Sequence, residues 1–212
     1  MSENPADLYK FSNGTLKNKL NITDPNKLHD VEYEHAYKNS IDLMKNAKKI
    51  KTNSLDDLSK IHQYMFGDTY YWAGVTRDNL PGHPDLEKNG HQFMPNAMMG
   101  NATQFINNEL QSTNQKKKPN ENDYANLLMD INDLHPFYEG NGRSCKTFLQ
   151  LVAKHHGQTI EYPRHQKELI NALNNLEPEQ VAKFITVEDI KKTKPSSKSS
   201  QKQTNKESEL EA

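Results

Sequence analysis

Residues 135–143 read His-Pro-Phe-Tyr-Glu-Gly-Asn-Gly-Arg, and this stretch constrains fold and chemistry more than any other part of the chain. Apolar residues then recur at three- and four-residue spacing from Cys145 to Val152, which predicts a helix over residues 141–156. A glycine-bearing loop that runs into a helix N-terminus suits an anion. Unpaired backbone N–H groups and the positive end of the helix dipole both attract negative charge there.

The residues at the end of this stretch match the chemistry of a phosphate group. Gly140 and Gly142 allow a positive φ and a close approach of the backbone to a phosphate. Asn141 adds an amide donor, and Arg143 adds a guanidinium fork that suits phosphate oxygens.

The two remaining polar residues complete a possible catalytic site. Glu139 would repel a phosphate, so it fits if a divalent cation such as Mg²⁺ bridges the two anions. His135 precedes the loop, and an imidazole that titrates near neutral pH suits a general base acting on a hydroxyl. The alternative is an ordinary turn beside an ordinary histidine, since Gly-Asn-Gly is also common turn chemistry.

The stretch resembles the motif of the Fic (filamentation induced by cAMP) domain family, His-x-Phe-x-(Asp/Glu)-Gly-Asn-Gly-Arg-x-x-Arg. Residues 135–143 match it throughout, whereas Lys146 stands in the place of the final arginine. Upstream, residues 71–77 read Tyr-Trp-Ala-Gly-Val-Thr-Arg and are similar to the family's Trp-Ala-Gly-x-x-Arg segment. The resemblance covers most of residues 25–190.

This resemblance implies a mostly α-helical bundle with a small β-hairpin flap over the active site. It implies a protein adenylyltransferase, which moves AMP from ATP to a Ser, Thr or Tyr hydroxyl of a target protein. In that reaction His135 would deprotonate the hydroxyl and Glu139 would hold Mg²⁺. The amides of Gly140–Gly142, with Asn141, would hold the α-phosphate, and Arg143 would contact the outer phosphates.

Lys146 is the one departure from the motif. It lies three residues after Arg143, so both side chains can share a helix face and bind the nucleotide. Lysine keeps the charge but loses the bidentate fork, so we expect a weaker grip on the terminal phosphate in a working enzyme. Two alternatives remain. Lys146 can be a solvated helix residue without a role, or the protein can be a nucleotide-binding or interaction module whose catalysis is lost or redirected.

Periodicity and capping residues predict helices through most of the chain. Asp24 followed by a proline opens a helix to about Lys49. Ser54 and Asp57 have the spacing of a capping box at the start of the next helix. The resemblance to the Fic family implies that Phe137 anchors the motif loop in the core. Further helices are predicted near residues 96–111, 121–134, 164–176 and 178–189.

The turn-rich residues 78–94 are predicted to form the hairpin flap. Phe93 and Met94 are candidate grips that would position the target's acceptor segment, which would pair with the flap as an added strand. A plain surface loop is the alternative, because the hairpin dipeptide Asn-Gly occurs in this stretch only at residues 89–90.

A self-inhibiting helix, (Ser/Thr)-x-x-x-Glu-(Gly/Asn), is common to many Fic proteins. Here Glu-Gly or Glu-Asn occurs only at residues 3–4, 121–122 and 139–140, and none has Ser or Thr four residues earlier. The chain therefore resembles the class that lacks an internal inhibitory helix. Such proteins are restrained by a small antitoxin protein, or they are not restrained.

Composition sets the remaining limits. No apolar run approaches the roughly 18–20 residues of a membrane span, and a single cysteine, Cys145, excludes an intramolecular disulfide. We interpret residues 1–24 as an N-terminal extension, 25–190 as the Fic domain and 191–212 as a disordered Lys/Ser-rich tail. Nucleic-acid binding by this tail is not favoured. The expected location is the bacterial cytoplasm, or a host cell if the protein is a secreted effector.

Overall fold

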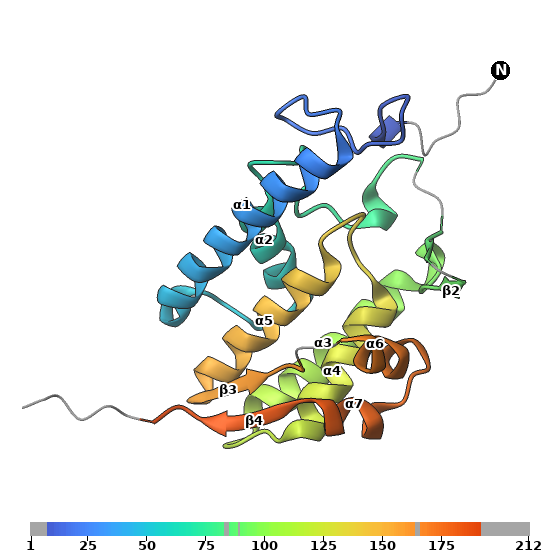
Figure 1. The fold of residues 1–212 in the computed structure, drawn as a ribbon. Coiled ribbons are helices and arrows are strands. Elements are labelled where there is room, and N and C mark those ends of the chain that lie inside the picture. The colour runs from blue at the N-terminus through green and yellow to red at the C-terminus, as the bar shows by residue number, and fades with distance from the viewer. Residues whose placement is uncertain (1–7, 83–84, 89, 164–165, 192–212) are drawn as a thin grey trace, which may run out of the picture.

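The computed structural model describes residues 8–82, 85–88, 90–163 and 166–191. Most of the described chain is helical, and two short two-stranded antiparallel sheets complete it (Figure 1). This confirms the expected mostly α-helical bundle with a small β-hairpin. The α-helices are α1 (Pro25–Lys45), α2 (Leu55–Phe66), α3 (Met99–Gln115), α4 (Glu121–Leu134), α5 (Asn141–His155), α6 (Lys167–Asn174) and α7 (Pro178–Phe184). The strands are β1 (Glu87–Lys88), β2 (His91–Gln92), β3 (Gln158–Glu161) and β4 (Thr186–Asp189), and the 3₁₀ turns are η2 (Ala47–Lys49), η3 (Arg77–Asn79) and η4 (Asn96–Met98).

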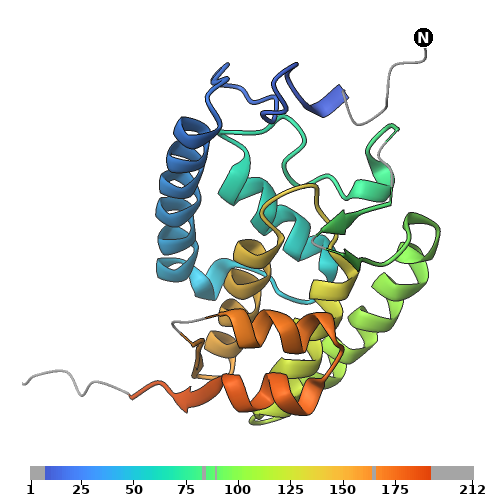
Figure 2. The same ribbon diagram turned by 45° about the vertical axis from the view of Figure 1, so that its right-hand side comes forward.

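Helix α5 lies in the middle of the bundle, and it begins within the 135–143 stretch (Figures 1 and 2). It contacts α1 and α2 on one side and α4 on the other. Helix α4 in turn packs against α3, α6 and α7. The motif is therefore built on the most enclosed helix of the fold.

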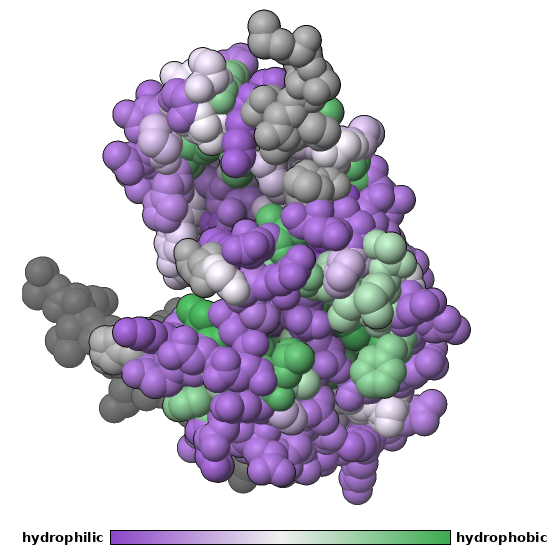
Figure 3. Space-filling view, turned by 90° about the vertical axis from the view of Figure 1, so that its right-hand side faces the viewer, coloured by the Kyte–Doolittle hydropathy of each residue, from purple (hydrophilic) through white to green (hydrophobic). Residues whose placement is uncertain are grey.

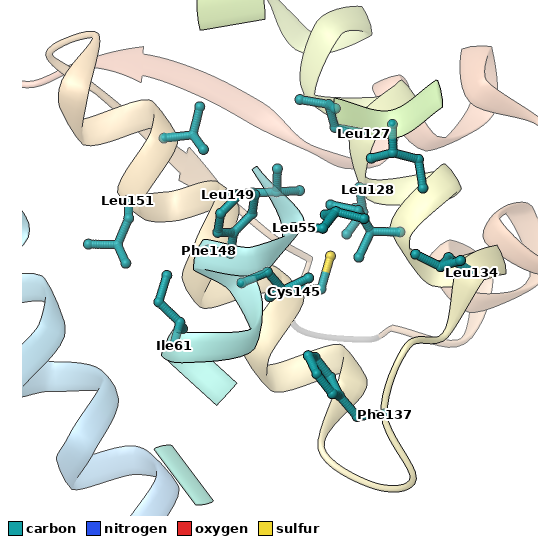
Figure 4. Close-up of a cluster of buried hydrophobic side chains, with 14 of the residues drawn as sticks. Leu55, Ile61, Leu127, Leu128, Leu134, Phe137, Cys145, Phe148, Leu149 and Leu151 are labelled. Atoms are coloured by element: carbon teal, nitrogen blue, oxygen red, sulfur yellow. The ribbon is translucent and has the colours of Figure 1, made fainter. Parts of the chain in front are cut away.

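One cluster of apolar side chains joins α2, α4 and α5 (Figure 4). Phe137, at the start of the motif loop, belongs to it and is 0% exposed, which confirms its expected role as a core anchor. Burying one such side chain contributes about 1.5–3 kcal/mol. Cys145 is buried in the same cluster. Other members are Leu55, Ile61, Leu127, Leu128, Leu134, Phe148, Leu149 and Leu151.

Helix α4 delivers His135 to the site. It starts at a complete capping box, in which the Asn120 side chain accepts the Asp123 N–H and the Asp123 carboxylate accepts the Asn120 N–H. It ends at His135, whose φ of 44° is left-handed. A non-glycine residue rarely adopts this conformation, so the surrounding structure must hold it there.

The capping box predicted at Ser54 and Asp57 is wrong. Ser54 precedes α2 but makes no side-chain cap. The Asp57 carboxylate instead accepts the Asn53 N–H at 3.0 Å. Asn107 of α3 accepts the Leu55 N–H at 2.8 Å, so a tertiary contact replaces the local cap.

Several predicted helix ends also need correction. Helix α1 stops at Lys45 and a 3₁₀ turn covers the rest of its predicted length, while α3 continues beyond residue 111 to Gln115. The helix predicted over 178–189 ends at Phe184, and β4 follows it. Strand β4 pairs with β3, for which no strand was predicted. Its β-branched Thr186 and Val187 fit that pairing better than a helix.

Parts of the predicted ends of the chain fall outside the described residues. Except for Lys191, the expected tail lies outside the described residues, as do residues 164–165 at the start of the helix predicted over 164–176, which corresponds to α6. Residues 8–24 are described, and the Lys19 N–H donates to Thr69 O at 2.8 Å, just beyond α2. Among the described residues, no helix combines the length and apolar character that crossing a membrane requires.

A pair of facing carboxyl groups between α3 and α4 predicts a pH-dependent stability. Burial, together with the neighbouring Asp130, raises the pKa of Glu109 to about 7, and burial also raises the pKa of Asp130. Because the folded-state pKa of Glu109 lies above its unfolded value, the shared proton stabilises the fold at low pH. That stabilisation is lost as the pH rises through about 7.

We therefore expect Glu109→Gln to match the wild type in melting temperature at about pH 5 and to exceed it at about pH 8.5. The amide keeps a donor for Asp130 and cannot ionise. Asp130→Asn serves as the reciprocal variant. Melting curves that differ equally at both pH values would contradict a shared proton.

Candidate active site

The motif loop is closed by the side chain of Asn141. Its Oδ1 accepts the Phe137 N–H at 2.8 Å, and its Nδ2 donates to Phe137 O at 2.7 Å. Asn141 is only 7% exposed. The amide predicted to face a phosphate is therefore engaged inside the loop. What Asn141 leaves for a ligand is its backbone N–H in the first turn of α5.

The two glycines have different roles. Gly140 has a φ of 83°, and a Cβ on it would lie 2.6 Å from the Phe66 ring, so only glycine fits. Gly142 lies within the first turn of α5 and has no positive φ, which corrects part of the prediction. A Cβ on Gly142 would meet nothing within 4 Å. The absent side chain there keeps space open beside the helix N-terminus.

His135 is held as a neutral base. Its Nδ1 lies 3.3 Å from Asn132 O, so the proton belongs on Nδ1 and the Nε2 lone pair remains available. Its ring stacks on Phe93 with centroids 3.8 Å apart. Burial lowers the pKa of His135 to about 3. It therefore does not titrate near neutral pH as predicted, and stays unprotonated across the physiological range.

The hairpin is tied to the end of α4. Strands β1 and β2 pair antiparallel, and the Met94 N–H just beyond them donates to Asp133 O at 3.0 Å. Phe93 is 5% exposed because its ring covers His135. Phe93 and Met94 thus lie beside the base, with Phe93 packed inward instead of projecting from the hairpin.

Arg77 holds the hairpin exit and the end of α4 together. It is 0% exposed, and its Nε donates to His135 O at 2.9 Å. Its Nη2 donates to Leu134 O at 3.0 Å and closely to Met94 O, while Nη1 donates to the Asn96 side chain. The last carbonyls of α4 are therefore bonded by a guanidinium, which fixes the left-handed turn at His135.

His62 of α2 supports the other half of the loop. Its Nδ1 accepts the Gly74 N–H at 2.9 Å, so its Nε2 carries the proton and donates to Glu139 O at 2.9 Å. Its ring stacks on Phe137 at 3.8 Å. Burial lowers the pKa of His62 to about 4. His62 was not predicted as a site residue, because in the sequence it looks like any other helical histidine.

The charged residues of the loop meet a carboxylate from α1. Arg143 Nη2 pairs closely with Glu32 Oε1 and lies 3.6 Å from Glu139 Oε1. Glu139 Oε1 also accepts the Gly140 N–H at 2.9 Å, and the Glu139 side chain is 37% exposed. Glu32 was missed as well, because it lies about a hundred residues upstream in a helix of many polar residues.

Lys146 and Arg143 diverge although both follow the loop. Lys146 Nζ bonds to Gln166 Oε1 before α6 and lies over the Tyr162 ring at 5.2 Å. Burial lowers the pKa of Lys146. Arg143 turns instead toward α1, yet both side chains line a second cavity of about 180 Å³ beside that helix.

A cavity of about 280 Å³ opens beside His135, between α4, α5 and α6. Phe93 and Gly142 line it, and apolar side chains of α4 and α6 share its wall with polar residues such as Asn132, Lys146 and Gln166. The apolar side chains are Leu128, Ile131, Leu169, Ile170 and Leu173. On the outer face shown in Figure 3, apolar residues lie in small groups among polar ones. The cavity beside His135 thus offers apolar side chains next to the loop's N–H groups.

The fold is the mostly helical Fic fold, and residues 52–153 match the Fic/DOC family. This match covers 102 of the 212 residues and includes the 135–143 stretch. It is 30% identical over 159 residues to the protein adenylyltransferase VbhT of Bartonella schoenbuchensis, covering 73% of this chain and 32% of VbhT. It is 26% identical over 163 residues to the probable protein adenylyltransferase Fic of Escherichia coli (strain K12), covering 75% and 78%.

A solved structure shows the same fold. The crystal structure of BepC, a VirB-translocated effector of Bartonella tribocorum with bound AMPPNP, superposes with a TM-score of 0.73 at 22% identity. The match covers 86% of this chain and 98% of that one. The likeness to VbhT is limited to about a third of that relative's length, so it concerns this domain alone.

The two glycines of the loop form a matched pair for mutagenesis. Gly140→Ala should destabilise the fold by about 1–3 kcal/mol, because of its positive φ and the Phe66 ring. Gly142→Ala should keep or raise stability, by up to about 1 kcal/mol, since alanine favours a helix. It should nevertheless weaken ATP binding by filling the open space. Thermal unfolding and ATP titration measure both effects. Wild-type ATP affinity in Gly142→Ala would show that no ligand approaches there.

Proposed function

We propose that this domain is a protein adenylyltransferase that transfers AMP from ATP to a Ser, Thr or Tyr hydroxyl of a target protein. The observation that carries the proposal is the unprotonated His135, which stands beside a loop of free N–H groups and Arg143. The homology to protein adenylyltransferases and the AMPPNP bound in BepC support it.

The reaction follows from these groups. The target hydroxyl gives its proton to His135 Nε2 while its oxygen attacks the α-phosphorus of ATP. The bond from the α-phosphorus to the bridging oxygen breaks, and pyrophosphate leaves. The first-turn N–H groups of α5, at Asn141, Gly142 and Arg143, stabilise the charge on the α-phosphate. A base with a low pKa is always ready to accept the proton, at some cost in basicity.

The adenine fits the cavity beside His135. Its volume of about 280 Å³ and its apolar wall suit a flat heterocycle, and it adjoins the loop at Asn141 and Gly142. The triphosphate then extends past Arg143, which takes its outer phosphates. Lys146 lines both cavities, so its ammonium contributes charge near the nucleotide without the oriented fork of an arginine.

Mg²⁺ fits this site only as an ion shared with the nucleotide. Within the described ranges no three His, Cys, Asp or Glu side chains lie together as a complete metal site. Glu139 is a half-exposed carboxylate beside the phosphate loop, which matches the single protein ligand that Mg²⁺ often takes with phosphates. When bound, the ion would neutralise phosphate charge. Glu139 would hold it.

The partners proposed are a target protein and, for control, a small antitoxin protein. The hairpin beside His135 supplies a strand to which an extended acceptor segment can add. A row of exposed side chains on α1, Tyr33, Tyr37 and Ile41, runs past the cavity that Arg143 and Lys146 line. An antitoxin helix with one apolar face and one carboxylate would fit this row of side chains and the two cations. A bacterial toxin or a translocated effector is consistent with both partners.

One observation favours the alternative of a nucleotide-binding module without transfer. Lys146 bonds to Gln166 and lacks the oriented fork that an arginine would direct at the outer phosphates. Transfer itself depends on His135 and the α-phosphate, which this change does not touch. We therefore place the alternative second.

His135→Ala should abolish transfer, because general-base catalysis contributes roughly 10²–10⁴-fold. The protein is incubated with a cell lysate and ATP labelled at the α- or γ-phosphate. Label from the α position alone indicates AMP transfer, from the γ position alone a kinase, and from neither a binding module. ATP binding should persist in His135→Ala. Transfer near the wild-type rate in this variant would refute its role as base.

The metal requirement gives a separate test at Glu139. Glu139→Gln should raise the Mg²⁺ concentration needed for half-maximal transfer by about tenfold or more, since the ion loses its carboxylate. Wild-type activity should also stop in excess EDTA. Glu34→Gln, which removes an exposed carboxylate on α1, is the matched control. Equal transfer in EDTA and in Mg²⁺ would exclude a shared cation.

A further inference from the structure

We propose that Glu32 is a positioning residue that holds the Arg143 guanidinium at the mouth of the phosphate loop. The proposal rests on the function proposed above, in which Arg143 contacts phosphates. Glu32 lies on α1, is 5% exposed and pairs closely with Arg143 Nη2. No residue near Glu32 in sequence belongs to the 135–143 motif.

The position of Glu32 within α1 is unusual for a carboxylate. The other buried residues of that helix are Leu28, Ala36 and Leu43, so Glu32 interrupts its apolar face. A buried carboxylate is costly unless it is paired and hydrogen-bonded. A leucine at position 32 would continue the apolar face of α1. The sequence instead places a carboxylate there, and its burial requires hydrogen-bonding partners besides Arg143.

Tyr70 supplies that second group. Its hydroxyl donates closely to Glu32 Oε2, and Tyr70 itself is 1% exposed. Burial and the nearby Glu32 charge raise the pKa of Tyr70, so it remains a donor. Its ring stacks on Trp72 with centroids 4.4 Å apart. Glu32 therefore has one oxygen fixed by the core and the other directed at Arg143.

Arg143 is constrained from three sides. The Phe66 ring lies 4.9 Å from its guanidinium carbon, and Glu32 and Glu139 both contact Nη2. The Arg143 side chain remains 33% exposed. With Nη2 held by Glu32, Nε and Nη1 are the donors left for phosphate oxygens.

Glu32 also competes with Glu139 for the Arg143 guanidinium. Arg143 Nη2 lies 3.6 Å from Oε1 of Glu139, four residues earlier in the chain, a distance at which opposite charges attract. Without Glu32, the guanidinium has Glu139 as its one anionic partner among the described residues and would close onto it. That closure would occupy the carboxylate proposed for Mg²⁺ and the fork proposed for phosphate.

Binding of Mg·ATP and of adenosine to the full chain tests this proposal without requiring a target. Glu32→Gln should weaken Mg·ATP binding about tenfold, the loss expected for one charge-assisted hydrogen bond. Adenosine binding should change less than about twofold, since Arg143 does not reach the base. Glu34→Gln, the same change at an exposed site on α1, should alter neither.

A double-mutant cycle shows whether Glu32 acts through Arg143. In an Arg143→Gln background, Glu32→Gln should have no further effect on Mg·ATP binding. Tyr70→Phe keeps the ring and frees Glu32, so it should weaken Mg·ATP binding in the same direction. This variant carries the test if Glu32→Gln fails to fold.

Each other outcome overturns the proposal. Unchanged Mg·ATP affinity in Glu32→Gln removes the positioning role, and tighter binding makes Glu32 a competitor of the phosphates. If Glu32→Gln weakens adenosine binding as much as Mg·ATP binding, Glu32 has a general structural role. If the wild type binds adenosine and Mg·ATP equally, or neither, the proposed function fails first.

Discussion

The buried guanidinium of Arg77 is the interaction on which the rest of the site depends. It is 0% exposed and donates to the backbone oxygens of Leu134, His135 and Met94. Its own N–H donates to Pro136 O at 2.8 Å. Removing such a charge from water costs several kcal/mol, and these charge-assisted hydrogen bonds, worth about 1.5–3 kcal/mol each, offset that cost. One side chain thus sets where α4 ends and where the hairpin returns.

The motif separates into residues that build the loop and residues left for chemistry. Phe137 and Gly140 fit against the core, and Asn141 ties the loop to itself, so none presents a side chain to a ligand. His135 and Glu139 keep reactive atoms accessible beside free N–H groups. One short loop can hold both the residues that pack against the core and those left for a ligand, because α5, the most enclosed helix, begins within it.

Local patterns in the sequence predicted much of this structure. The helix over residues 121–134 follows from periodicity, and the anchoring by Phe137 follows from the resemblance of the motif to the Fic family. Local patterns do not show which residues far apart in the sequence contact one another in the fold. Strand β4 exists because β3 pairs with it, and the weak base His135 results from burial under Phe93. Glu32 is likewise meaningful only once α1 lies beside α5.

His62 and His135 both make the stability of the fold sensitive to acid. His62 and His135 are neutral in the fold, with pKa values of about 4 and about 3, whereas an unfolded histidine titrates near 6.5. Below that value the unfolded chain binds more protons than the folded one, so stability falls before either imidazole is protonated in place. The lower pH limit of this domain would then be set by loss of its structure, with His135 still unprotonated.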